Sequence, residues 1–345
     1  MGKNKNGMKV GILTAGGDCP GINAAIRGVG KTAIIKYNMI IIGISDGFTG
    51  LINKEFIELT EKDLSGILTV GGTILGTSRE KPFKSTDKGK ETRKPDLIKE
   101  HYEQMGLDCL VCIGGNGTIK TAYLLSQEGL NVVGIPKTID NDVWGTDVSF
   151  GFDSAVNIAT EALDRLHSTA NSHKRIMLIE LMGHNAGWLA LYSGIAGGGD
   201  VILIPEIPYK ETKIAEYLLQ RAEENKPYSI VVAAEGVENP DKERSVGQYL
   251  SKRITELTGL ETRETVLGYI QRGGTPSPMD RVLATRYGSA AADMIAARDF
   301  GKMVALKNNK IVDIPLADVA GKLKLVEPDN PLVIQARNMG TSFGV

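Results

Sequence analysis

Short apolar runs alternate with longer amphipathic segments along most of this chain. Apolar runs of this kind, bounded by glycine and polar turns, are typical of buried strands, and the longer segments between them have helical spacing. In the first part of the chain the pattern predicts strands at Met8–Thr14, Met39–Ile44, Asp108–Ile113 and Asn131–Val133, and helices at Ile22–Ala33 and Ile119–Gln127.

The same alternation continues from near Gly151. A chain in which strands and helices alternate throughout is typical of an α/β fold, with mostly parallel sheets flanked by helices. A length of 345 residues is enough for two domains of ordinary size. The second part is predicted to contain strands at Arg175–Leu181, Asp200–Ile204, Ser229–Ala234 and near Met303–Leu306, and helices at Val156–Thr169, through Trp188 and Leu191, and at Asp280–Arg298.

Two of the predicted strands end in glycine-rich loops that lead into helices. Gly16–Gly21 follows the first strand, and Gly114–Thr118 follows the strand Asp108–Ile113. Backbone N–H groups at such helix N-termini suit an anion, above all phosphate. One Gly-Gly loop is a weak signal, but parallel strands bring both loops to the same edge of a sheet. Together they indicate a nucleotide or polyphosphate site.

A third turn, Pro136–Asp142, follows the strand Asn131–Val133 and carries two aspartates, Asp140 and Asp142. Carboxylates this close repel each other unless a proton or a metal ion separates them. The end of a parallel strand is also where α/β enzymes place reacting groups. The alternative is a polar turn whose Asp and Asn side chains only cap the backbone. The two glycine loops favour a chemical role.

Further cations occur beside glycine turns. Arg79 ends the glycine-framed stretch Gly71–Arg79, and Arg263 and Arg272 flank Tyr269 just before Gly273. Two arginines with a tyrosine resemble a clamp for a phosphorylated substrate, the alternative being ordinary surface arginines. The charged stretch from Arg79 to His101, with eight Lys or Arg residues, is otherwise predicted to be solvated.

Composition excludes several functions. A net charge of -1 gives no basic field for nucleic acid. No apolar run reaches membrane-spanning length, and the polar N-terminus lacks the apolar core of a signal peptide. Cys109 and Cys112 have C-x-x-C spacing but lie inside a predicted core strand, so a packing role is favoured over metal or redox chemistry. We therefore predict a cytoplasmic protein that binds neither nucleic acid nor membranes.

These motifs together resemble the 6-phosphofructokinase family. The resemblance runs from Lys9 to about Pro315 and is carried by Gly16–Arg27, Gly114–Thr118, Pro136–Asp142, Ser172–Arg175 and Thr265–Gly274. It implies two Rossmann-like three-layer domains with the active site in the cleft between them. The donor domain would comprise 1–151 plus 271–321, and the fructose 6-phosphate domain 152–270 plus 322–345. The implied reaction is phosphorylation of the 1-hydroxyl of fructose 6-phosphate in glycolysis, with Mg2+ as cofactor.

The resemblance also implies roles for individual residues. Asp140 would be the base, supported by Asp142, with Gly17, Thr138 and Arg175 completing the catalytic set. Residues implied at the donor site are Gly17, Phe48, Arg79, Glu80, Gly115, Asn116, Gly117 and Thr118. Residues implied at the sugar phosphate are Thr138, Ile139, Asp140, Arg175, Met182, Gly183, His184, Glu235, Arg263, Tyr269 and Arg272. Because Arg175 and Arg263 would reach in from a neighbouring subunit, the resemblance implies a homodimer or homotetramer.

The chain departs from the usual family pattern at several positions. Asn116 stands where an aspartate near the metal is usual, so Mg2+ would be bound either directly or through water. His184 stands in place of arginine and Tyr269 in place of histidine. Arg27 and Lys31 of a nucleotide effector cluster remain, but His167 and Glu224 occupy other positions of that cluster. The effector site is therefore predicted to be lost.

Two positions bear on the phosphoryl donor. Gly117 is the residue found in ATP-dependent relatives, whereas Lys137 is the residue found in pyrophosphate-dependent ones. A carboxylate in place of Gly117 would crowd and repel the nucleotide, so Gly117 favours ATP. Phe48 is expected to offer an aromatic face to adenine. The alternatives are a pyrophosphate-dependent enzyme, another kinase with Gly-Gly loops such as a NAD or lipid kinase, and a non-catalytic nucleotide-binding module.

Overall fold

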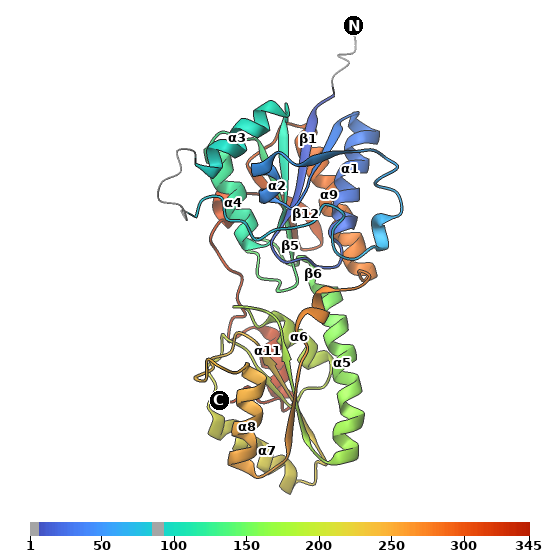
Figure 1. Cartoon of the computed structure of the whole chain (residues 1–345). Helices are drawn as coiled ribbons and strands as arrows, with labels where there is room; N and C mark the ends of the chain where they lie inside the picture. Colours follow the sequence, from blue (N-terminus) through green and yellow to red (C-terminus); the bar gives the residue numbers. More distant parts are fainter. Residues whose placement is uncertain (1–6, 85–92) are drawn as a thin grey trace. The chain divides into compact units, whose positions relative to one another are not determined.

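The structure is a computed structural model that describes residues 7–84 and 93–345 (Figure 1). Its internal contacts divide the chain into two compact units. Unit 1 comprises the chain up to Thr138, then Val143–Gly151 and Arg272–Leu323. Unit 2 comprises Ile139–Asp142, Phe152–Gln271 and Lys324–Val345. Each unit has its own sheet, and the two are described separately below.

Unit 1 is built on an eight-stranded sheet with the order β12-β11-β5-β4-β1-β2-β3, and β6 pairs with β5. The central strands are parallel, whereas β3 and β12 join the edges antiparallel. The strands are β1 (Lys9–Ala15), β2 (Ile40–Ile44), β3 (Phe56–Leu59), β4 (Cys109–Gly114), β5 (Val132–Thr138), β6 (Phe150–Gly151), β11 (Lys302–Lys307) and β12 (Lys310–Pro315).

Helices cover both faces of this sheet. Figure 1 shows α1 and α9 together on one side, with α3 and α4 on the other. The second face buries a core that includes Leu13, Leu110 and Ile119. The helices of unit 1 are α1 (Ile22–Tyr37), α2 (Phe48–Asn53), α3 (Lys94–Gln104), α4 (Asn116–Gln127), α9 (Pro278–Ala296) and α10 (Leu316–Val319), with a 3-10 turn η1 (Ile67–Thr69).

Cys112 lies in this core, and Cys109 is buried at the start of the same strand; both are free thiols. Burial in apolar surroundings raises the pKa of both thiols well above the ordinary range. They therefore stay protonated and pack as small apolar side chains. The prediction of a packing role is confirmed.

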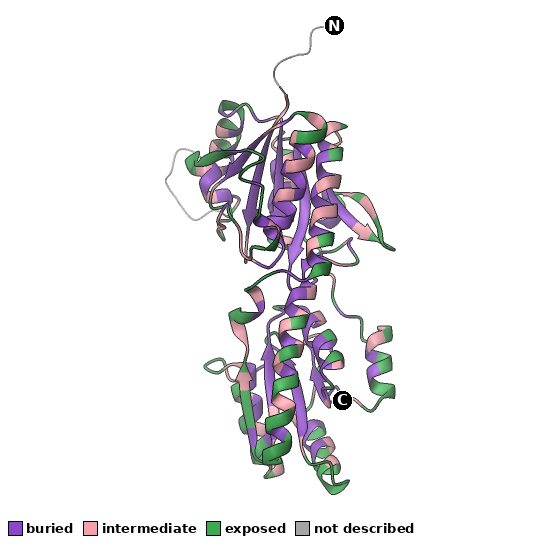
Figure 2. Ribbon diagram, turned by 90° about the vertical axis from the view of Figure 1, so that its right-hand side faces the viewer, coloured by how far each residue is buried: buried purple, intermediate pink, exposed green. Residues whose placement is uncertain are grey.

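Unit 2 has a four-stranded, entirely parallel sheet with the order β10-β7-β9-β8. Strands β7, β8 and β9 are almost entirely buried, whereas the edge strand β10 is largely exposed. The outer faces of the helices are exposed, as Figure 2 shows by colour. The strands are β7 (Ile176–Leu181), β8 (Val201–Leu203), β9 (Ser229–Ala234) and β10 (Thr262–Val266). The helices are α5 (Phe152–His173), α6 (Trp188–Ala196), α7 (Glu211–Glu223), α8 (Val246–Thr258) and α11 (Pro331–Asn338), and a 3-10 turn η2 (Gly268–Arg272) follows β10.

The predicted fold class, α/β with mostly parallel sheets, is confirmed, but several elements differ from the sequence prediction. The first helix continues to Tyr37, where Asn38 adopts a left-handed conformation that ends it. The helix predicted at Val156–Thr169 spans Phe152–His173. No helix was predicted at α7 or α8, and no strand at β3 or β12. Part of the charged stretch between Arg79 and His101 lies outside the described residues.

Candidate active site

The two predicted glycine loops and the start of the third segment, Pro136–Thr138, lie at one edge of the unit 1 sheet. Strands β1, β4 and β5 are adjacent and parallel, and Ala15 pairs with Gly114, which pairs with Pro136. The two glycine loops and the segment leading to Asp140 therefore begin at the same level of the sheet. This is the carboxyl edge, where parallel sheets bind ligands. The predicted convergence of the two glycine loops is confirmed.

The first glycine loop is fixed through its carbonyl oxygens. Lys137 Nζ donates to Gly17 O, and Thr77 Oγ1 donates to Gly16 O at 2.7 Å. Arg272 Nη1 donates to Asp18 O at 3.2 Å. The loop is thus attached to three other segments of unit 1. Because its carbonyls are held in this way, anion binding depends on its N–H groups.

Gly17 lies against the end of the Arg272 side chain. A Cβ at this position would lie 2.7 Å from Arg272 Nη1 and 2.9 Å from Arg272 Cζ. The guanidinium therefore packs directly against the loop. The prediction assigned Gly17 to the donor and Arg272 to the sugar phosphate, and the structure brings these two residues into contact within unit 1.

Cys19 lies in the same loop but offers no nucleophile. It is fully buried, and its Sγ donates to Phe150 O at 3.7 Å. Burial raises the pKa of the thiol to about 12, so the thiolate is not populated at neutral pH. The chemistry of the loop is therefore that of its backbone and its neighbouring cations.

The second glycine loop leads directly into the N-terminus of α4. Gly115 caps the helix without a side-chain hydrogen bond, and no acidic residue occupies the first turn. The positive end of the helix dipole is therefore not compensated by a neighbouring carboxylate, which favours an anion. Gly117 is exposed, and a Cβ built on it meets nothing within 4 Å. Thr118 is buried and its Oγ1 donates to Ala15 O at 3.3 Å.

Three other predicted donor residues occupy different environments. Arg79 is exposed and follows Ser78, whose carbonyl accepts from Gly16 N at 2.9 Å. Glu80 pairs with Lys94 at 3.0 Å. The Phe48 side chain is 1% exposed and packs in the hydrophobic core. Its predicted role as a stacking face for adenine is therefore not supported, because the ring is covered by core side chains.

The Asp140–Asp142 turn is shaped by the residue between the two aspartates. Asn141 has φ of +50° and is 3% exposed, while Asp140 and Asp142 are half-buried. Asn141 Oδ1 accepts from Lys324 Nζ at 2.9 Å, and Lys324 N donates to Asp142 O at 2.8 Å. Upstream, Thr138 ends β5 and is buried, as is Ile139.

A second group of predicted residues lies at the carboxyl edge of the unit 2 sheet. Leu181 and Ala234 pair at the ends of β7 and β9, so Met182 and Glu235 follow side by side. Glu235 Oε1 accepts from His184 N at 3.0 Å, and Gln271 Oε1 accepts from Met182 N at 3.3 Å.

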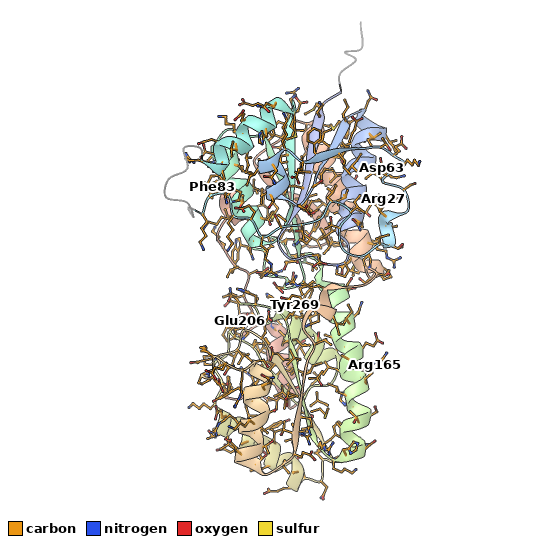
Figure 3. The ribbon with its side chains drawn as sticks, viewed as in Figure 1. Arg27, Asp63, Phe83, Arg165, Glu206 and Tyr269 are labelled. Carbon is orange, nitrogen blue, oxygen red and sulfur yellow. The ribbon has the colours of Figure 1, made fainter. Side chains whose placement is uncertain are left out.

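The backbone conformation at this edge is unusual at two positions. Gly183 has φ of +143°, and a Cβ there would lie 2.6 Å from Ala186 O. His184 also has positive φ, at +49°, and is exposed. Tyr269, labelled in Figure 3, is 72% exposed in this chain.

Arg175 and Arg263 lie at the opposite edge of the same sheet. Arg175 immediately precedes β7 and Arg263 is the second residue of β10, whereas Met182 follows the end of β7. The six residues of β7 span roughly 20 Å at the usual rise per residue. This is longer than a hexose phosphate. The structure therefore holds Met182 and Arg175 of the same chain at opposite edges of the sheet, with Arg175 paired to Glu261.

The two arginines share one carboxylate. Glu261 Oε2 accepts from Arg175 Nε at 2.6 Å, and Glu261 Oε1 accepts from Arg263 Nη2 at 2.7 Å. These contacts hold the pKa of Glu261 below its usual value, and the hydrogen bond from Arg175 is the main cause. Glu261 therefore stays ionised at neutral pH and opposes both positive charges.

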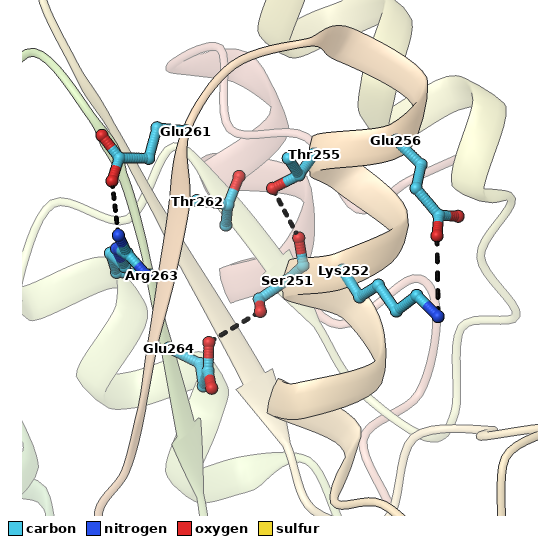
Figure 4. A pocket seen from close by; sticks show the side chains of 8 residues that line it. All are labelled: Ser251, Lys252, Thr255, Glu256, Glu261, Thr262, Arg263 and Glu264. Carbon is cyan, nitrogen blue, oxygen red and sulfur yellow. Dashed lines mark hydrogen bonds and ion pairs between the residues drawn. The ribbon is translucent and has the colours of Figure 1, made fainter.

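Beside this ion pair lies an open pocket of about 410 Å³ between α8 and β10 (Figure 4). It is lined by polar and charged residue types, and acidic and basic side chains form ion pairs within it, as Lys252 does with Glu256 at 3.8 Å. None of the residues of the Asp140–Asp142 turn lines it. The lining residues are Ser251, Lys252, Thr255, Glu256, Glu261, Thr262, Arg263 and Glu264.

No group of three or more His, Cys, Asp or Glu side chains within residues 7–84 and 93–345 is arranged to hold a metal ion. None of the helices in these two ranges is long and apolar enough to cross a membrane.

Sequence reasoning did not assign a role to Lys324, Glu261 or Gln271. Glu261 carried a signal, because an acid two residues before Arg263 on a strand lies on the same face. Gln271 lies inside the motif Thr265–Gly274 that was recognised as a whole. Lys324 carried no local signal, since its partner Asn141 is 183 residues away.

Two phosphate-type loops at the carboxyl edge of a parallel sheet, followed by an acidic turn, define a phosphate-binding α/β protein. The family described as Phosphofructokinase matches residues 9–295. The chain belongs to the phosphofructokinase family, and the resemblance found in the sequence is confirmed.

Two curated relatives match over nearly their whole length. "ATP-dependent 6-phosphofructokinase 3" of Bacteroides thetaiotaomicron is 61% identical over 337 residues, covering 98% of this chain and all of the relative. "ATP-dependent 6-phosphofructokinase" of Spirochaeta thermophila is 59% identical over 354 residues, covering 97% of each chain.

Solved structures also match. Pichia pastoris phosphofructokinase in the T-state has a TM-score of 0.83 at 33% identity, and covers 92% of this chain. The chain spans only 36% of that longer yeast chain. The pyrophosphate-dependent phosphofructokinase from Marinobacter aquaeolei has a TM-score of 0.82 at 24% identity, with 94% of this chain and 88% of that one covered. The likeness to the Marinobacter structure concerns the fold alone.

Proposed function

We propose that this protein is an ATP-dependent 6-phosphofructokinase, which transfers the γ-phosphoryl group of ATP to the 1-hydroxyl of fructose 6-phosphate in glycolysis. The observation that carries the proposal is the meeting of both glycine loops and the segment leading to Asp140 at one edge of the unit 1 sheet. The names of the two relatives described above support the donor and the acceptor. The cytoplasmic location stays a prediction.

The test is product formation. Purified protein with fructose 6-phosphate, ATP and Mg2+ should produce fructose 1,6-bisphosphate and ADP in equal amounts. Hydrolysis of ATP without formation of the bisphosphate would contradict the proposed acceptor. Binding of ATP without any turnover would instead favour a nucleotide-binding module.

Unit 1 would bind the donor. N–H groups of the Gly17 loop and of the α4 N-terminus would hold phosphate oxygens, with Lys137 nearby as a fixed positive charge. Arg79 would reach the transferring group from its exposed position. Phosphoryl transfer needs in-line positioning and charge stabilisation rather than covalent help, and these N–H groups and cations would contribute the charge stabilisation.

Mg2+ bound with the donor would neutralise charge on the transferring phosphoryl group. The residues fit an ion held mainly by phosphate oxygens and water, since no acidic metal cluster occurs in the described residues. Asn116, the first residue of α4, would supply an amide oxygen directly or through water. Phosphofructokinases with an aspartate at the position of Asn116 would differ in this contact, because their ligand to the metal ion would carry a negative charge.

Unit 2 and the acidic turn would hold the sugar. Asp140 would accept the proton of the 1-hydroxyl as the new bond forms, with Asp142 supporting it. Thr138 and Ile139, together with Met182, Gly183 and His184, would contact the sugar. Glu235 would accept hydrogen bonds from its hydroxyls, and Tyr269 and Arg272 would bind the 6-phosphate.

Arg175 and Arg263 would serve the site of a second subunit. They lie at the edge of the unit 2 sheet opposite to Met182 of their own chain. The edge strand β10 also leads into exposed apolar side chains, Val266, Tyr269 and Ile270, which favour contact with another chain. A homodimer or homotetramer follows from this proposal.

Complementation tests the shared site. Arg175→Ala subunits mixed with Asp140→Asn subunits should regain activity, because one site of each hybrid then contains both residues. In a randomly mixed dimer half of the molecules are hybrid, so activity should reach about a quarter of the wild-type value. The measurement is the specific activity of hybrids whose formation is shown by differential tagging. Hybrids as inactive as the parents would contradict a site built from two chains.

Glu261→Gln should strengthen binding of fructose 6-phosphate. In the free chain the single carboxylate of Glu261 pairs with both arginines that the 6-phosphate needs, so a neutral amide removes this competition. Exposed ion pairs contribute little each, so the KM for fructose 6-phosphate should fall by about 2- to 10-fold while kcat changes little. Glu264→Gln, on the same strand and bonded to Ser251, is the matched control. An unchanged or higher KM in Glu261→Gln alone would show that no competition exists.

The lysine at position 137 is the reason to consider pyrophosphate as a second candidate donor. Its side chain is 2% exposed and bonded to Gly17 O, so it holds the first glycine loop in place. A buried cation at this position stabilises the phosphates of either donor. Lys137 therefore does not select pyrophosphate, and Gly117 is the position that discriminates.

The loss of the nucleotide effector site remains a prediction. Both ring nitrogens of His167 lie within hydrogen-bonding distance of unit 2 partners, Tyr228 Oη at 3.0 Å and Gly197 O at 2.6 Å. Glu224 ends α7 and accepts from Gln220 Nε2 at 2.9 Å. His167 is engaged within its own unit, and the carboxylate of Glu224 would repel an anionic effector.

A further inference from the structure

The short segment Lys324–Val326 is tied directly to the acidic turn. Lys324 Nζ donates to Asn141 Oδ1 at 2.9 Å, and Lys324 N donates to Asp142 O at 2.8 Å. The first hydrogen bond holds the side chain of Asn141, which lies between the two aspartates. The second holds the backbone of Asp142 at the end of the turn. Both partners belong to unit 2.

Lys324 is itself held by a tryptophan. Trp188 Nε1 donates to Lys324 O at 2.8 Å, and Lys324 Nζ lies 5.5 Å from the centroid of the Trp188 ring. A cation at this distance from an indole face is attracted to it. The ammonium group is therefore positioned from one side by the ring and from the other by the Asn141 amide.

The end of the segment is anchored to the start of α6. Glu206, labelled in Figure 3, accepts from Val326 N at 2.9 Å and from Gly187 N at 2.9 Å. Gly187 precedes Trp188, the first residue of α6. The segment and the tryptophan that contacts Lys324 are thus fixed by the same carboxylate.

The backbone of the turn has a left-handed residue at its centre. Asn141 has φ of +50°, a conformation that asparagine adopts more readily than most non-glycine residues. Because Asn141 stands between Asp140 and Asp142, rotation of its backbone would redirect both carboxylates. Displacement of a reacting group by about 1 Å can reduce turnover by about 100-fold.

We propose that Lys324 is a positioning residue for the phosphoryl-transfer reaction, which acts through Asn141 to aim Asp140 at the acceptor hydroxyl. The inference rests on the proposed function, in which Asp140 is the base. The backbone contact of Lys324 with Asp142 needs no particular side chain. The contact with Asn141 needs a donor at the end of a long chain, and this is the contribution of the lysine.

Lys324→Met tests the proposal, since methionine keeps an apolar stem over Trp188 and the backbone N–H while it removes the ammonium group. We expect kcat to fall by about 10- to 100-fold, with the KM values for ATP and fructose 6-phosphate within about 3-fold of wild type. Lys324→Arg should recover part of the lost kcat, because it restores a cationic donor. Lys322→Met, an exposed lysine two residues earlier, is the matched control and should leave kcat unchanged.

The variant Asn141→Gly provides an independent test. Glycine adopts positive φ without strain, and the substitution removes the side-chain amide that Lys324 contacts. If Lys324 acts through Asn141, the double variant Lys324→Met/Asn141→Gly should have nearly the kcat of the worse single variant. If the kcat losses of the two single variants multiplied in the double variant, the proposal would be overturned. A Lys324→Met variant with a changed KM and an unchanged kcat would also overturn it. Should Lys324→Met fail to fold, a wild-type kcat in Asn141→Gly would overturn it equally. A wild-type protein inactive on fructose 6-phosphate would instead refute the proposed function.

Discussion

Replacing Asp140 with Asn should reduce turnover on fructose 6-phosphate by on the order of 10²- to 10⁴-fold, the usual contribution of a general base. An amide has the shape of the carboxylate but cannot accept the hydroxyl proton as the phosphoryl group arrives. The half-buried position of Asp140 beside Asn141 is compatible with this isosteric change. The measurement is steady-state kcat and KM for both substrates.

The KM for fructose 6-phosphate should change little in Asp140→Asn, because the sugar is held mainly by other residues. Asp142→Asn serves as the comparison, since it alters the other carboxylate of the same turn and should cost less turnover. Near-normal kcat in Asp140→Asn would exclude the residue as the base. A rise in KM with unchanged kcat would assign it to substrate binding instead.

Gly117→Asp should strongly reduce kcat/KM for ATP. A carboxylate at the N-terminus of α4 would face the donor phosphates, and like charges this close in a dry site repel by on the order of several kcal/mol. An energy of about 3 kcal/mol corresponds to roughly a 100-fold loss in kcat/KM for ATP. With Lys137 already present, slight use of pyrophosphate could be gained, which a coupled assay would detect.

The structure separates charge from size at this position. A Cβ at Gly117 meets nothing within 4 Å, so the free protein should fold normally with any small side chain. Gly117→Asn is therefore the matched control, with the same volume and no charge, and it should retain far more ATP activity. Equal losses in the two variants would indicate steric exclusion. No loss in either would mean that the donor lies elsewhere.

Much of unit 1 could be predicted from the sequence because its central strands are fully buried and continuous in apolar residues. The pattern located β1, β4 and the loops after them, which are local features of a few residues each. It located only the start of β5, because the strand continues to Thr138 through Pro136 and Lys137, which were predicted as a turn. Gly117 and Asn116 were likewise placed at a helix N-terminus from spacing alone. These are the parts of the site in which chain neighbours are also spatial neighbours.

Other elements were missed for identifiable reasons. Helix α7 begins after Lys210, which provides no side-chain cap and hence no start signal. Helix α8 does carry a signal, the capping box of Ser245 and Gln248, that was not used. The antiparallel pair β11 and β12 turns at Asn308 and Asn309, both with positive φ. Adjacent asparagines of this kind are typical of a hairpin turn.

The contacts that the sequence could not reveal join distant segments. Lys324 meets Asn141, and Arg175 meets Glu261, across 183 and 86 residues. Phe48 illustrates the opposite error, because its aromatic ring fitted a ligand role in the sequence and packs in the core instead. Spacing identifies which residue types gather at a sheet edge, but packing decides which of their faces remain open to a ligand.

The most direct test of the proposed function compares two donors with one acceptor. The wild-type protein is assayed with saturating fructose 6-phosphate and Mg2+, offering ATP in one series and pyrophosphate in the other, and fructose 1,6-bisphosphate is quantified. We predict rapid turnover with ATP and little or none with pyrophosphate. Faster turnover with pyrophosphate than with saturating ATP would contradict the assignment of the donor, and no bisphosphate with either donor would contradict the proposed function itself.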